Sequence, residues 1–211
     1  MAGTRTTELE AVNTMLSAVG EPPINSLDEQ KNVDAAIANN ILTEISREIQ
    51  GHGWHFNTQI NVDLTPDSTT NFINLTDDMV RVDIDHWTSS TGVDTSVTDS
   101  RDVTQRGGRL FDRSNNTYEF TKKVTATVIF VFDWEDLPEP ARRYITVRAA
   151  RIFQDRMVGS QAHHAFSQED EVRALALLKE FEGDTADHSI FGNWDVYRIV
   201  ARPDAARRGS L

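Results

Sequence analysis

Apolar residues recur at helical spacing near the start of the chain, and this spacing predicts a helix over residues 7–19. Its apolar stripe comprises Leu9, Val12, Leu16 and Val19. Thr7 and Glu10 have the spacing of a capping box at its start. A helix-turn signature, which predicts a sharp end because proline cannot continue a helix, comprises Gly20, Pro22 and Pro23. A helix this short is unstable alone in water, so it must pack on other helices.

The same kind of spacing predicts three further helices, over residues 26–50, 138–158 and 167–181. Capping-box spacings at Ser26 and Ser167 mark the start of the first and the last of these. Their apolar stripes comprise, in chain order, Val33, Ile37, Ile41, Ile45 and Ile49; Ile145, Ala149, Ile152, Phe153 and Met157; and Val172, Leu175, Leu178 and Phe181.

Between these helical pairs the apolar period changes to two. The alternation predicts strands over residues 60–64 and 80–84, and the apolar run over residues 124–132 predicts a buried strand. Gly107-Gly108 predicts a turn. Residues 88–105 are small, polar and acidic, which predicts a long hairpin tip or loop.

Together these elements predict an α+β protein. Two sequence-distant helical hairpins form a four-helix bundle, because neither can bury its apolar face alone, and an antiparallel β domain is inserted between them. The expected units are residues 1–54 (first hairpin), 55–135 (β domain), 136–188 (second hairpin) and 189–211 (C-terminal arm). Large side chains where the chain crosses between helices and strands predict an interdomain joint, made of Trp54, Phe56, Trp134 and Pro138.

The C-terminal arm combines large aromatic residues with a basic end. The residues concerned are Phe191, Trp194, Tyr197, Arg198, Arg202, Arg207 and Arg208. Aromatic residues and arginine are enriched at protein interfaces. The arm therefore either folds back on its own helices or docks on another chain.

The net charge of the chain argues against one class of function, tight binding of nucleic acid. The 211 residues include 21 Lys and Arg against 33 Asp and Glu, a net charge of −12. Tight phosphate binding needs clustered basic residues, so such an acidic chain is not expected to bind nucleic acid tightly. There is no cysteine, hence no disulfide and no thiolate zinc site. No apolar run approaches the length of a membrane span, and no signal peptide is expected.

Candidate catalytic chemistry is sparse. Asp83 and Asp85 stand two apart beside Trp87, which could serve a polysaccharide- or cell-wall-degrading hydrolase. We favour a solvated strand face, because residues two apart on a strand point to one side. His52 and His55 stand three apart, but glycines around them break the helix, so we expect neither a metal site nor a cofactor.

Several motifs stand in order along the chain: ELEAVNTMLSAVGEPPINSL at residues 8–27, GWHFN at 53–57, Gly107-Gly108 before Asp112-Arg113, and DLPE at 136–139. With these motifs the chain resembles the tail tubular protein A family of short-tailed, T-seven-like bacteriophages. Residues 86–105 and the arm from Ser189 depart from the family pattern.

The resemblance implies a structural virion protein and no enzyme. It implies a head-to-tail connector, or gatekeeper, that forms a dodecameric adaptor ring between the portal protein and the tail nozzle protein (tail tubular protein B), with the tail fibre nearby. Genome DNA would pass through the ring during ejection without specific binding. The location implied is the virion tail, after assembly in the host cytoplasm, without a membrane. The hydrolase, and a binding module of a host bacterium, remain as alternatives.

Overall fold

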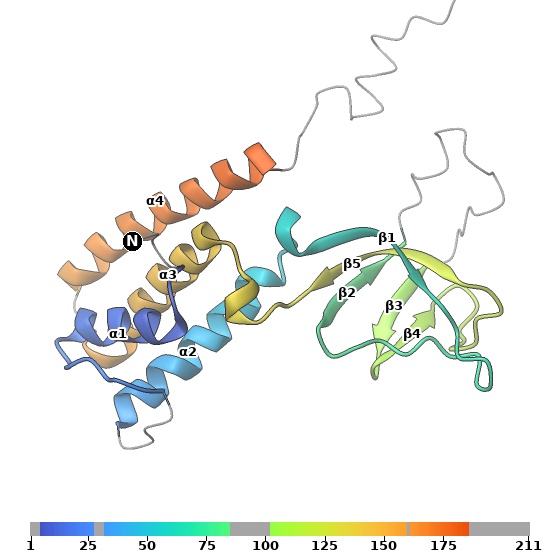
Figure 1. Ribbon diagram of the computed structural model, residues 1–211, viewed down its shortest axis with the longest axis horizontal. Coiled ribbons are helices and arrows are strands. Elements are labelled where there is room, and N and C mark those ends of the chain that lie inside the picture. Colours follow the sequence, from blue (N-terminus) through green and yellow to red (C-terminus); the bar gives the residue numbers. More distant parts are fainter. Residues whose placement is uncertain (1–4, 28–31, 85–101, 160, 186–211) are drawn as a thin grey trace, which may run out of the picture.

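The computed structural model describes residues 5–27, 32–84, 102–159 and 161–185, with only the backbone for residues 161–167. It is an α+β protein in which the helices form one region and the strands a second region beside it (Figure 1). The helices are α1 (Glu8–Val19), α2 (Val33–Gln50), α3 (Glu139–Met157) and α4 (Gln161–Thr185). The strands are β1 (Thr58–Leu64), β2 (Met79–Asp83), β3 (Val103–Arg106), β4 (Arg109–Asp112) and β5 (Val124–Phe130). Two short 3-10 helices, η1 (His55–Asn57) and η3 (Trp134–Asp136), lie where the chain crosses between the regions.

The first helix begins and ends as its sequence predicts. The hydroxyl of Thr7 accepts a hydrogen bond from the backbone N–H of Glu10 (3.2 Å), and the Glu10 carboxylate accepts one from the N–H of Thr7 (2.8 Å). Gly20 ends α1 in the left-handed conformation, with φ at 84°, which costs glycine little. The amide of Asn13 then pairs with both backbone groups of Ile24 and fixes the turn against α1.

The predicted starts of α2 and α4 are wrong. Asn32, not Ser26, caps α2, because its side-chain oxygen accepts from two free N–H groups of the first turn. α4 already begins at Gln161, six residues before the predicted cap at Ser167.

The predicted apolar stripes are correct in their centres and wrong at several ends. Residues spaced four apart in a helix are displaced by about 40° around its axis at each step. The ends of a long series with this spacing therefore point away from the core. Ile41, Ile45 and Ile49 of α2 are accordingly buried, whereas Val33 is 70% exposed. The other exposed members of the predicted stripes are Ile37, Met157 and Val172.

α3 is the central helix. It packs against α1, α2 and α4, and α1 also packs against α2. The helices share one core, in which α4 contributes Ala174 and Leu178, and in which the predicted α3 residues Ile145, Ala149 and Phe153 are fully buried.

The strands form two antiparallel sheets. The first has the order β1-β5-β2, with the apolar strand β5 in the centre, and the second is the hairpin of β3 and β4. The hairpin turns at Gly107-Gly108, as predicted, but β3 occupies residues predicted as loop. The two sheets share a second core, formed by Leu64, Ile73, Leu75, Val82, Ile84, Val103, Leu110, Phe120, Val124, Ala126 and Val128.

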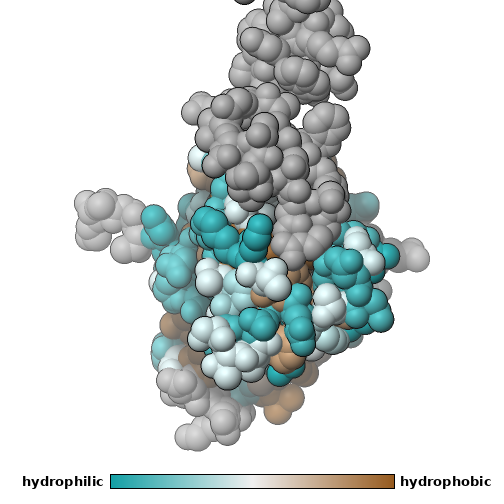
Figure 2. All heavy atoms as spheres, turned by 90° about the vertical axis from the view of Figure 1, so that its right-hand side faces the viewer, coloured by the Kyte–Doolittle hydropathy of each residue, from teal (hydrophilic) through white to brown (hydrophobic). Residues whose placement is uncertain are grey.

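β-Bulges interrupt the alternation predicted for both edge strands. Asn61 takes a φ of 59°, and the register of β1 against β5 shifts between Gln59 and Val62. A similar shift occurs in β2 between Met79 and Arg81. Bulges turn side chains away from the regular pattern, so Ile60 is 69% exposed and Val80 is exposed as well. Seen from the end of the molecule formed by the sheets, most of the coloured surface is hydrophilic or intermediate, with small apolar patches (Figure 2).

Candidate functional site at the helix–sheet junction

The chain leaves the helical region at the end of α2, where Gln50 is fully buried. The side-chain oxygen of Gln50 accepts a hydrogen bond from the N–H of Phe132 (2.7 Å), and its amide nitrogen donates to the carbonyl of Phe132 (3.1 Å) and to the hydroxyl of Ser46 (3.0 Å). The Gln50 side chain therefore pairs with both backbone groups of Phe132, as a neighbouring β-strand would, and so links the last turn of α2 to the segment that follows β5.

A second buried amide, Asn57, extends this link to the sheet. Its side-chain nitrogen donates to the carbonyls of Gln50 (2.8 Å) and Phe130 (2.6 Å), and its side-chain oxygen accepts from the N–H of Trp54 (2.8 Å). A buried polar group destabilises a fold only when it lacks partners. Both amides have hydrogen-bond partners, so their burial is compatible with a stable fold. We call Gln50 and Asn57, with their partners, the outgoing crossing.

Aromatic side chains surround the outgoing crossing. Trp54 donates its indole N–H to the carbonyl of Ile49 (2.8 Å) and packs, with Phe56 and Phe132, against the helical core. Gly53 has a φ of 80°, and a Cβ atom there would lie 2.4 Å from Cδ1 of Ile129 in β5. Glycine adopts this φ at little cost, and any larger residue would also displace the side chain of Ile129.

The return crossing from β5 to α3 is built around a buried arginine. Arg142 is 3% exposed and donates to the carbonyls of Thr6 (2.8 Å), Leu137 (2.9 Å) and Glu135. Trp134 donates its indole N–H to the same Thr6 carbonyl (2.9 Å). One guanidinium therefore binds together the N-terminal segment, the middle of η3 and the residue that follows η3.

The four residues predicted as an interdomain joint thus lie at the two crossings. Trp54 and Phe56 lie at the outgoing crossing, Trp134 lies at the return crossing, and half-buried Pro138 immediately precedes α3. Their role as a joint stays a prediction. Sequence reasoning missed Gln50 and Arg142, because polar residues in a helix normally face solvent.

A pocket of about 260 Å³ opens beside the return crossing, between α1, α2 and residues 131–135. Burial, together with the nearby carboxylates of Glu135 and Asp133, raises the pKa of Glu8 above its ordinary value. Arg47 lines the pocket as well. Such a pocket favours a cationic group, but the described residues contain no group of three or more His, Asp or Glu that could hold a metal ion.

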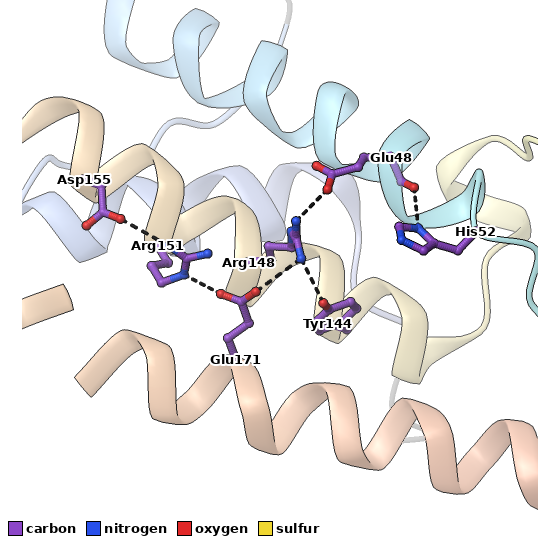
Figure 3. A network of polar contacts seen from close by, with 7 residues as sticks. All are labelled: Glu48, His52, Tyr144, Arg148, Arg151, Asp155 and Glu171. Atoms are coloured by element: carbon purple, nitrogen blue, oxygen red, sulfur yellow. Dashed lines mark hydrogen bonds and ion pairs between the residues drawn. The ribbon is translucent and has the colours of Figure 1, made fainter. Parts of the chain in front are cut away.

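An arginine network holds α4 on the other helices (Figure 3). Arg148 of α3 binds Glu48 of α2 (2.6 Å) and Glu171 of α4 (3.5 Å), and Arg151 binds the other oxygen of Glu171. Burial alone would lower the pKa of Arg148. The hydrogen bond to Tyr144 and the negative charges of Glu48 and Glu171 outweigh burial, so the pKa is raised. The guanidinium therefore stays charged between three helices.

The remaining predicted site residues lie apart from the junction or outside the description. Gly20, Pro22 and Pro23 form the exposed turn after α1. Exposed Asp83 ends β2, whereas Asp85 and Trp87 lie outside the described residues. The predicted docking residues of the C-terminal arm, from Phe191 to Arg208, also lie outside them. No helix in the described part of the chain is long and apolar enough to cross a membrane.

Two comparisons with known proteins agree with each other. The family model Tube, described as tail tubular protein, matches residues 9–188. Among curated proteins, the chain is similar to tail tubular protein A of Klebsiella phage KP34, with 25% identity over 174 residues, which is 82% of this chain and 86% of that protein. The range that the family model matches contains both cores and, except for Thr6, the residues of both crossings, and it ends before the C-terminal arm.

Proposed function

This chain belongs to the tail tubular protein family of bacteriophages and is a structural protein of the phage tail, and from that membership we propose that it acts as the adaptor ring between head and tail. In this role copies of the chain, twelve by the family resemblance, form a ring that joins the portal protein to the tail nozzle protein. The tail fibre attaches near the junction of ring and nozzle. Assembly takes place in the host cytoplasm, before the ring becomes part of the virion tail.

The observation that carries this proposal is the pair of hydrogen-bonded crossings. An adaptor must present surfaces to two different partners at a fixed relative position, because a loose connection would let the channel bend. The helical region and the sheet region, each built around its own core, offer two such surfaces. The buried side chains of Gln50 and Asn57 join the end of α2 to β5 and to the segment that follows it, and buried Arg142 fixes the segment that leads back to α3. No carboxylate takes part in these hydrogen bonds.

The charge of the chain supports a role in DNA passage. A net charge of −12 repels the phosphates of a duplex and so favours movement over adhesion. We place predominantly acidic residues on the channel wall of the ring. Reversal of several of these carboxylates to lysine should slow genome release at low salt, and unchanged ejection kinetics would contradict the charge argument.

The C-terminal arm completes the proposal. Phe191, Trp194 and Tyr197, with the arginines that follow, would dock on the portal or on a neighbouring subunit. Truncation of residues 190–211 should then leave a folded protein that assembles poorly onto the portal. In this organisation residues 1–54 and 136–188 act as the helical unit and residues 55–135 as the β unit.

Negative-stain electron microscopy, with light scattering, tests the proposal directly. The full chain is mixed with the portal protein of its own phage. We expect a closed ring seated on the portal and a mass that matches a whole number of copies. A protein that stays monomeric and leaves the portal bare would overturn the adaptor role, while its membership of the family would stand.

A further inference from the structure

The end of the β3–β4 hairpin carries two arginines that directly face each other. Arg106 and Arg109 are paired across the two-residue turn of Gly107 and Gly108, whose φ values are 60° and 70°. Residues paired in this way share one face of the hairpin, and like charges opposite each other are unfavourable. Both arginines are exposed. Within the described residues, neither has a carboxylate within ion-pair distance.

Aromatic rings hold both guanidinium groups in place. The guanidinium carbon of Arg106 lies 4.1 Å from the ring centre of Phe111, and that of Arg109 lies 4.9 Å from the ring centre of Phe72. Tyr118 packs edge-on between the two rings, at 4.8 Å from Phe111 and 6.3 Å from Phe72. We call these five residues the arginine–aromatic face.

This geometry prepares the face for binding. A guanidinium that stacks on a ring keeps its N–H donors directed outward at its edge, where a carboxylate can accept two of them. Stacking also restricts the side chain before binding, so less conformational entropy is lost on contact. Arginine and tyrosine are among the residue types enriched at the positions that contribute most to the energy of protein interfaces.

We propose that the arginine–aromatic face binds the acidic surface of a second copy of this chain and forms part of the contact between neighbouring subunits. The inference rests on the proposed ring. A ring interface is heterologous, so each copy must offer two different and complementary patches. With 33 acidic against 21 basic residues, a second copy is the partner that supplies the opposite charge. The carboxylates of Glu8, Asp133 and Glu135, which lie at or around the pocket of the return crossing, are examples.

A nucleic acid partner fits the same observations less well. Two arginines can neutralise about two phosphates, which gives weak and strongly salt-dependent binding, and the acidic remainder of the chain repels a duplex. A carboxylate partner requires only the two guanidinium edges that the rings already hold in position.

The test compares two double variants with the same net charge. Arg106→Glu/Arg109→Glu reverses the face, and Lys122→Glu/Lys179→Glu reverses two exposed lysines elsewhere. Ring formation on the portal is followed by light scattering and negative-stain microscopy over a range of protein concentrations. We expect the first variant to need at least about tenfold more protein for half-maximal assembly, and the second to need at most about twofold more.

Folding and the nature of the partner are controlled separately. Urea unfolding should give similar midpoints for all proteins, and if the glutamate variant does not fold, Arg106→Gln/Arg109→Gln replaces it in the same assay. Wild-type assembly by the arginine-face variant overturns this inference and leaves the adaptor role intact. Failure of the wild-type chain to form a ring overturns both. Binding of a 20-base-pair duplex that is lost only in the arginine-face variant, with normal rings, assigns the face to DNA and overturns the inference.

Discussion

The two crossings between helices and sheet solve the same structural problem with different chemistry. At the outgoing crossing the neutral amide of Gln50 pairs with both the N–H and the carbonyl of Phe132. At the return crossing Arg142 donates to several carbonyls and accepts nothing. An amide both donates and accepts, whereas a guanidinium only donates. The comparison teaches that the unpaired backbone groups at each crossing determine which residue type fits. An N–H beside a carbonyl is satisfied by an amide side chain, whereas several carbonyls that point to one place are satisfied by an arginine.

Removal of the buried guanidinium should have the largest effect. Arg142→Met leaves the carbonyls of Thr6, Leu137 and Glu135 without this donor, and we expect a loss of about 3–5 kcal/mol in the free energy of unfolding. Arg142→Lys retains the charge but not the planar donor set, and should recover only part of this loss. Urea unfolding followed by circular dichroism measures both, and equal stability of the methionine variant and the wild type would break the comparison.

A Cβ atom at Gly53 should cost about 2–3 kcal/mol, since Gly53→Ala meets both an unfavourable positive φ and a clash with Ile129. A double-mutant cycle with Ile129→Val sharpens the cause, because valine lacks the Cδ1 atom that lies 2.4 Å away. The combined variant should be more stable than the sum of the single losses predicts. Strict additivity would show that the clash contributes nothing.

Loss of an amide at the outgoing crossing should cost about 2 kcal/mol. Asn57→Ala removes two donations and one acceptance by a neutral group, and neutral hydrogen bonds contribute less than those of a charged donor, so the effect should be smaller than that of Arg142→Met. Thermal unfolding compares Asn57→Ala with Asn74→Ala, an exposed asparagine of the same region whose φ is not positive, and the latter separates amide loss from the general effect of truncation. If Asn57→Ala lowers the free energy of unfolding more than Arg142→Met does, the expected order of the two crossings is wrong.

The smallest expected effect concerns pH. Burial and the carboxylates of Glu135 and Asp133 raise the pKa of Glu8 in the folded protein above its value of 4.5 in the unfolded chain. The folded state therefore binds this proton more tightly, and the resulting stabilisation is present below pH 4.5 and is lost as the pH rises through the folded pKa. Glu8→Gln should flatten the pH dependence of the unfolding midpoint above pH 4.5, and a pH dependence equal to that of the wild type would contradict this assignment.

Sequence reasoning predicted the features that depend on local chemistry. The capping box at Thr7, the end of α1 at Gly20 and the hairpin turn at Gly107-Gly108 each follow from the preferences of one or two residues, and each is present. The central strand β5 followed from its apolar run.

The features that were missed depend on contacts between distant segments. Ile60 faces solvent because a bulge at Asn61 changes the register, and no periodicity announces a bulge. Arg142 looks like a surface residue of α3 until the N-terminal segment brings the carbonyl of Thr6 to it. Gln50 likewise acquires its role only when residue 132 returns beside the end of α2.

The bond between Arg142 and the Thr6 carbonyl spans 136 positions of the chain, and this separation sets the order of events during synthesis. The N-terminal segment emerges from the ribosome first, but its guanidinium partner is translated roughly 10 s later at typical elongation rates. Until then the apolar side of α1 has no α3 to cover it. The first helix to be made is therefore secured late, and during that interval α2 is the one of its two helical packing partners that has already been made.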